Sequence, residues 1–77
     1  MDKSNINTRS KLKQITSVKD FENLLNQTML SEEEKQILRI HYKEQKSLSF
    51  IGDTLGMSET TVKRKHRKAL LKLGKSF

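Results

Sequence analysis

The chain has 77 residues, 32% of them apolar and four of them aromatic, so it can form one domain with a small core and no deep substrate cleft. It has no cysteine for a disulfide or a thiolate zinc site, and no apolar run of the length that a signal peptide or a membrane span needs. Its net charge is +7, and residues 58–77 carry seven basic side chains and one acidic side chain. The charge leads us to expect a polyanionic partner, and the lack of cysteine and of a signal sequence leads us to expect a cytoplasmic location.

The first thirty residues contain one segment without a pattern and one with a helical pattern. Residues 1–16 are rich in Asn, Ser, Thr and Lys without a hydrophobic period, so we expect a flexible basic arm. Ser17 and Asp20 have the S-x-x-D spacing of a helix start, and apolar residues then recur every three or four positions. This pattern predicts a first helix over 17–28 and places the helical domain at 17–77.

Two further helix starts follow in the middle of the chain. Ser31 and Glu34 have the spacing of a capping box, which predicts a second helix from there to about Gln45. Ser47 can cap a short third helix that reaches Leu55.

A tight corner separates the third helix from the fourth. Gly56 is suited to the left-handed residue that ends a helix, Met57 can fill the turn, and Ser58 can cap the next helix. A basic fourth helix then runs to about Leu73. The sequence thus predicts an all-α fold of four short helices with a helix-turn-helix at 47–73.

The fourth helix has an apolar stripe with a histidine in it. The packing residues are Val62, Ala69, Leu70 and Leu73. We expect His66, which lies in the stripe, to be partly buried and hydrogen-bonded. His41 and His66 lack accompanying ligands at metal spacing, and no catalytic set or phosphate-binding glycine loop is present, so we expect no metal, no cofactor and no enzymatic activity.

The opposite face of this helix is the candidate DNA-reading surface. An α-helix fits the major groove, and side chains early in the helix reach base edges, so base contacts are assigned to Glu59, Thr60, Lys63 and Arg64. Arg64 suits guanine and Glu59 suits the cytosine amino group. Phosphate contacts are assigned to Ser47, Thr61, Lys65, Arg67 and Lys68. Each side chain taken singly could be a solvated surface residue, but the set follows a helix-turn-helix corner.

The segment from Leu30 to Leu73 resembles region 4 of bacterial RNA polymerase sigma factors. The matching positions are Leu30, Ser31, Glu34, Ile37, Leu38, Tyr42, Ser47, Ile51, Leu55, Gly56, Met57, Ser58, Thr61, Val62, Lys63, Ala69, Leu70, Lys72 and Leu73. The resemblance implies a domain that reads the promoter −35 element and contacts RNA polymerase.

This chain departs from the region 4 pattern at several positions. Gly52 replaces the usual alanine, which is expected to weaken the third helix by roughly 0.5–1 kcal/mol. Phe50 replaces an acidic residue, and Lys65 and His66 stand where aliphatic residues are usual. The role of the recognition helix therefore carries over, but its target sequence does not.

The leading hypothesis is a sequence-specific DNA-binding transcription regulator. One alternative is a LuxR-type domain, which this chain resembles at Ser58, Glu59, Thr61, Val62, Lys63 and Lys72 to Gly74. The other alternative is a module that binds polymerase or another transcription factor without reading DNA. Because the chain has no room for a domain that melts the −10 element, we expect a stand-alone regulator, half of a split sigma factor or an excised domain. Met1 favours an independent product of a phage or mobile element. The expected location is then the bacterial cytoplasm or nucleoid, or the host cytoplasm for a phage-encoded protein. Leu71 and Phe77 are candidates for a homodimer contact.

Overall fold

The structure, a computed structural model, describes the backbone of residues 3–74 and the side chains of residues 8–74. This part of the chain is helical and contains no strand, which confirms the predicted all-α class. Its elements in chain order are α1 (Lys3–Gln14), α2 (Val18–Gln27), α3 (Glu32–Leu38), the π-helical turn η1 (Arg39–Lys43), α4 (Leu48–Leu55) and α5 (Glu59–Gly74).

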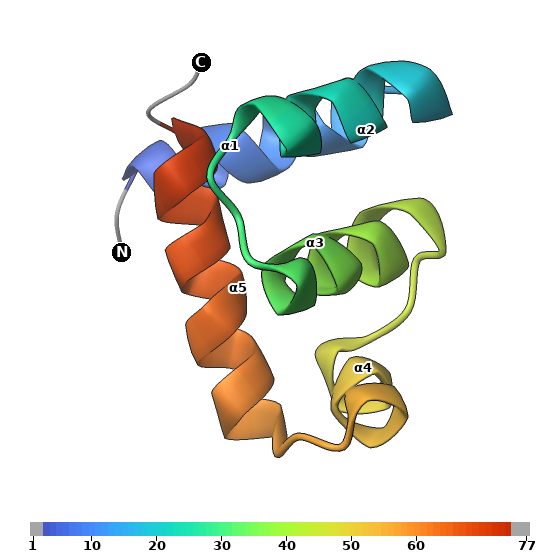
Figure 1. Cartoon of the computed structure of the whole chain (residues 1–77). Helices are drawn as coiled ribbons and strands as arrows, with labels where there is room; N and C mark the ends of the chain where they lie inside the picture. Colours follow the sequence, from blue (N-terminus) through green and yellow to red (C-terminus); the bar gives the residue numbers. More distant parts are fainter. Residues whose placement is uncertain (1–2, 75–77) are drawn as a thin grey trace.

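Helix α5 is the element against which the others are arranged (Figure 1). Helices α1 and α2 lie at its C-terminal end, α3 lies beside its middle, and α4 lies at its N-terminal end. One buried cluster joins α1, α2, α3 and α5, and its members are Leu12, Phe21, Leu25, Leu38, Ala69, Leu70 and Leu73. A second, smaller cluster lies beneath the helix-turn-helix and contains Ile37, Ile51 and Val62.

The N-terminal segment differs from the prediction. Residues 3–14 form α1, so the expectation of a flexible arm was wrong for this segment, and the described chain has five α-helices where four were expected. Leu12 is only 1% exposed and packs with residues of α2 and α5, and Thr8 is buried as well. With so few apolar residues the segment has no periodic signal of its own, and contacts with the rest of the domain hold the helix in place.

The predicted caps of the next two helices are confirmed. The Ser17 hydroxyl accepts a hydrogen bond of 3.3 Å from the Asp20 amide at the start of α2. At the start of α3, the Ser31 hydroxyl accepts from the Glu34 amide at 3.2 Å, and the Glu34 carboxylate accepts from the Ser31 amide at 2.8 Å. Local side-chain chemistry therefore determines both helix starts.

The second predicted helix has the expected extent but an irregular second half. Helix α3 ends at Leu38, and the chain continues through the π-helical turn η1, in which the Glu44 amide donates to the Arg39 carbonyl at 3.2 Å. The turn η1 ends at Lys43, and Gln45, two residues later, is a non-glycine residue with a φ of 58°. Such turns and left-handed residues recur near functional sites.

Candidate nucleic-acid interface

Helices α4 and α5 form the predicted helix-turn-helix corner. The Ser47 hydroxyl accepts from the Phe50 amide at 3.1 Å and begins α4, and Gly56 ends it with a φ of 73°. The Ser58 hydroxyl then accepts from the Thr61 amide at 3.2 Å and begins α5. The three-residue connection and both caps agree with the sequence analysis.

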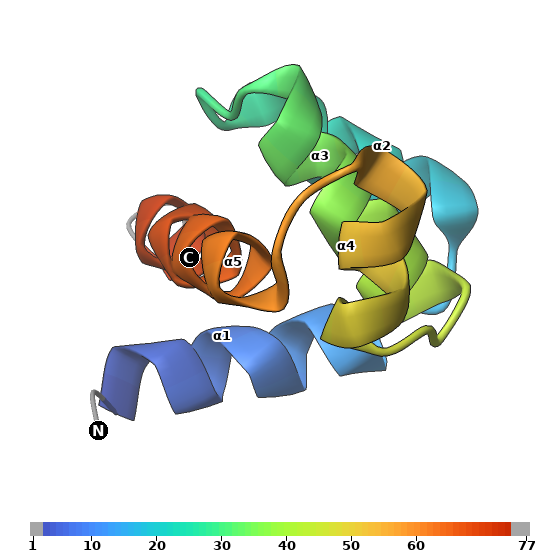
Figure 2. The same ribbon diagram turned by 90° about the horizontal axis from the view of Figure 1, so that it is seen from below.

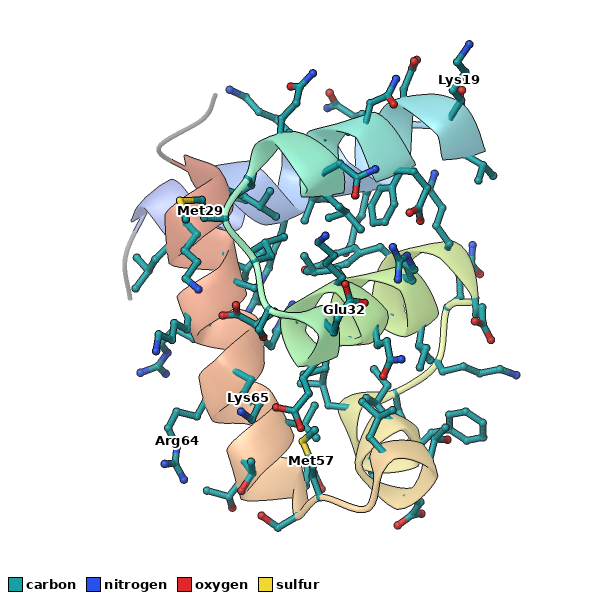
Figure 3. The ribbon with its side chains drawn as sticks, viewed as in Figure 1. Lys19, Met29, Glu32, Met57, Arg64 and Lys65 are labelled. Atoms are coloured by element: carbon teal, nitrogen blue, oxygen red, sulfur yellow. The ribbon has the colours of Figure 1, made fainter. Side chains whose placement is uncertain are left out.

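The corner is tightened by a close approach at Gly52. The Met57 amide donates to the Gly52 carbonyl at 2.8 Å, and a Cβ atom at position 52 would lie 2.6 Å from the Met57 carbonyl oxygen. Met57 itself lies between α4 and α5 (Figure 3) and packs against the smaller core cluster. Glycine at position 52 therefore permits this turn. The same residue also lowers the helix propensity of α4, as expected.

The inner face of α5 is fixed to the domain by apolar packing. Its buried side chains are Val62, His66, Ala69, Leu70 and Leu73, which are the predicted stripe with its histidine. His66 is 3% exposed, and its Nε2 atom shares a hydrogen bond of 2.8 Å with the Tyr42 hydroxyl. The prediction of a buried, hydrogen-bonded histidine is confirmed.

His66 and Tyr42 lie in a cluster of rings that disfavours charge. Burial lowers the pKa of His66 to about 4, and electrostatic interactions with His41 and Arg9 act in the same direction. Burial also raises the pKa of Tyr42 to about 12. The His41 ring meets the His66 ring edge-on, with their centroids 5.1 Å apart. At neutral pH both Tyr42 and His66 are therefore uncharged where α5 meets η1.

Two ion pairs also join α5 to α3. Lys72 Nζ lies 2.8 Å from a Glu34 carboxylate oxygen, and Lys65 Nζ lies 3.1 Å from a Glu33 carboxylate oxygen. Burial raises the pKa of Glu34, but the hydrogen bonds from Lys72 and Ser31 outweigh burial and hold that pKa below its ordinary value. Neither pair could be predicted from the sequence, since no local spacing relates partners more than thirty residues apart.

The outer face of α5 carries the four predicted base-contact residues. Glu59, Thr60, Lys63 and Arg64 are all exposed. Arg64 extends away from the body of the domain (Figure 3). Lys63 Nζ lies 3.4 Å from a Glu59 carboxylate oxygen, and because both side chains are exposed this pair is weak and can open. The structure therefore leaves these side chains accessible to a partner.

Only part of the predicted phosphate set is brought together. Thr61, Lys65 and Lys68 line a groove of about 270 Å³ with Arg64. Arg67 is exposed elsewhere on α5. Ser47 lies instead at the start of α4 and lines another pocket, together with lysines that the sequence analysis did not select.

Residues 8–74 contain no group of three histidine or acidic side chains that could hold a metal ion. Within the described helices, none is both long enough and apolar enough to cross a membrane.

Comparison with known proteins supports one of the two families considered above. The model of the family described as Sigma-70, region 4 matches residues 29–75, more than half of the chain, and that segment includes α3, α4 and α5. Neither a curated protein nor a solved structure matches the chain. The family match agrees with the helix-turn-helix geometry, and the chain therefore belongs to the Sigma-70, region 4 family of DNA-binding helix-turn-helix domains.

Proposed function

We propose that this chain is a sequence-specific DNA-binding transcription regulator of the sigma region 4 type, in which α5 enters the major groove. The observation that carries the proposal is the division of α5 into two faces. One face is buried against α3 and α4, and the other is exposed and basic. A helix held at a fixed angle with its charged face free is what major-groove binding requires.

The roles within α5 follow from position along the helix. Arg64 is the candidate for a bidentate contact with a guanine, because its guanidinium extends outward early in the helix. Glu59, Thr60 and Lys63 lie on the same exposed surface and complete the proposed base-reading set. The Glu59–Lys63 pair would open when either side chain meets a base.

The remaining cations and hydroxyls serve the phosphate backbone in this proposal. They are Ser47, Thr61, Lys65, Arg67 and Lys68. Lys68 and Thr61 line the groove beside Arg64, which suits a phosphate that flanks the contacted base. Lys65 would divide its interaction between the phosphate and Glu33, since its ammonium already pairs with that carboxylate.

Contact with RNA polymerase forms part of the proposal, because the region 4 resemblance implies it and because a single helix in the groove gains affinity from a tethered partner. We place the protein in the cytoplasm, where RNA polymerase and DNA are found. A second copy of the chain is the other proposed source of affinity. Leu71, one of the two residues predicted for that contact, is 44% exposed on α5, and the other, Phe77, lies outside the described residues.

The test begins with selection of bound duplexes from a random pool, with and without RNA polymerase. Arg64→Ala is expected to reduce the favourable free energy of DNA binding by about 1–3 kcal/mol and to relax the sequence preference at one base position. Lys68→Ala is expected to weaken binding to all sequences alike. It should also lower the log-log slope of affinity against salt concentration by about 1. Lys19→Ala is the matched control, because Lys19 lies on α2 and points away from the domain (Figure 3). Unchanged affinity in both α5 variants would contradict the assignment of α5.

A further inference from the structure

A second basic pocket lies away from the exposed face of α5. It has a volume of about 580 Å³ and is lined by Lys13, His41, Tyr42, Gln45, Lys46 and Ser47. These residues come from α1, from η1 and from the segment that leads into α4. Figure 2 shows the C-terminal end of α1 and the beginning of α4 on the same side of the domain.

The lining of this pocket is cationic and contains no acidic residue. Lys13 and Lys46 are both exposed, and neither pairs with a carboxylate in the part of the chain that the structure describes. Lys46 lines the pocket, and its Nζ atom lies 5.3 Å from the centroid of the Phe50 ring. Two lysines that are more than thirty residues apart in sequence thus border one cavity.

Hydrogen bonds orient the polar groups between the two lysines. His41 Nδ1 lies 2.8 Å from the Lys46 carbonyl oxygen, and because a carbonyl only accepts, Nδ1 carries the hydrogen. The Ser47 hydroxyl oxygen accepts from the Phe50 amide, so its hydrogen can be donated to another acceptor. The pocket therefore offers donors and positive charge to an anion.

The backbone around the pocket is irregular in two places. The π-helical turn at 39–43 supplies His41 and Tyr42, and Gln45 has a φ of 58°. A left-handed non-glycine residue is energetically unfavourable and persists only where the surrounding structure holds it, and such residues cluster at ligand sites. Both irregular segments contribute residues to this pocket.

We propose that this pocket binds one phosphate group of the DNA backbone, so that α1 becomes part of the DNA interface. The proposal rests on the proposed function above and extends it. The occupant is a phosphate of a polymer because the two lysines stand exposed at the surface and Ser47, already assigned to a phosphate, lies at the start of α4. Helix α1 lies outside residues 29–75, so the family match does not supply this contact.

The first experiment measures duplex affinity of the full chain against salt concentration. The variants are Lys13→Ala, Lys46→Ala and the double variant, with Lys19→Ala as the control. Loss of one phosphate contact is expected to reduce the log-log salt slope by about 0.9, which corresponds to about an eightfold loss of affinity at 0.1 M salt relative to 1 M. Circular dichroism checks that the variants remain folded, as expected for exposed lysines.

The second experiment identifies the phosphate. Methylphosphonate substitutions neutralise the backbone of a bound duplex one position at a time. At one position the neutral linkage should weaken the wild-type chain by a similar factor and leave the double variant unaffected. The loss of affinity from the two lysine substitutions and the loss from the neutral linkage are then not additive, as is found for partners in direct contact.

The outcomes separate this proposal from the proposed function. If the wild-type chain binds no duplex, both fail. If Arg64→Ala and Lys68→Ala weaken binding while the Lys13/Lys46 double variant keeps its affinity and salt slope, only the pocket proposal is overturned. A loss of affinity that couples to no single methylphosphonate position would also overturn it, because it would reflect general charge alone.

Discussion

Acid should destabilise this domain through His66, the buried histidine of α5. Its side chain is 3% exposed and meets His41 and Tyr42 from η1. Burial, helped by His41 and by Arg9 of α1, lowers the pKa of His66 from 6.5 to about 4 in the folded state. An unfolded chain holds the proton near pH 6.5, so between these two values the unfolded state binds more protons than the folded state.

The sign and size of the effect follow from this difference. The stabilising contribution is complete above pH 6.5, falls as the pH drops toward 4, and loses nothing more below that value. Over the full window the loss is about 3 kcal/mol, and between pH 7 and pH 5 it is about 2 kcal/mol. These figures are large beside the total stability of about 5–15 kcal/mol of a typical domain.

Urea unfolding followed by circular dichroism at pH 5, 6 and 7 measures the effect. The matched variant is His66→Gln, which can still hydrogen-bond to the Tyr42 hydroxyl but does not titrate. The wild-type chain should lose about 2 kcal/mol more than the variant between pH 7 and pH 5. Equal pH dependence in the two proteins would show that burial of His66 does not cause the loss of stability. Carboxylates with a lowered pKa, such as Glu34, titrate at lower pH in both proteins and do not mask the difference.

Three substitutions at close or buried contacts should lower the free energy of unfolding. Gly52→Ala should cost about 1–3 kcal/mol, because the added Cβ would lie 2.6 Å from the Met57 carbonyl oxygen; thermal unfolding that matches wild type would contradict this close approach. Leu12→Ala should cost about 2–5 kcal/mol in urea unfolding if α1 belongs to the core, and an exposed arm would show no change. Lys72→Met should destabilise the domain by about 1–3 kcal/mol because it leaves the Glu34 carboxylate buried with fewer partners, and the loss should disappear in the Glu34→Gln background.

The elements that local chemistry specifies could be predicted from the sequence. Ser17, Ser31 and Ser47 each begin a helix by accepting a hydrogen bond from an amide three residues later. Gly56 adopts the left-handed conformation that ends α4. These features depend on residues a few positions apart, so the pattern contains the necessary information.

Features that depend on distant contacts could not be predicted in the same way. Leu12 holds helix α1 in a core that also contains residues of α2 and α5. The sequence of α1 itself has no helical hydrophobic period. Lys65 was assigned to a DNA phosphate, and no pattern in the sequence indicates that its ammonium also pairs with Glu33 of α3. The pocket that contains Lys13 and Lys46 arises only when α1 and η1 are placed relative to α4.

Chemical-shift mapping of the full chain with a selected duplex identifies the surface that contacts DNA. If α5 reads DNA, the largest amide shifts fall on residues 59–68, the N-terminal part of this helix. If those amides stay unmoved while another surface shifts, α5 is not the element that reads DNA.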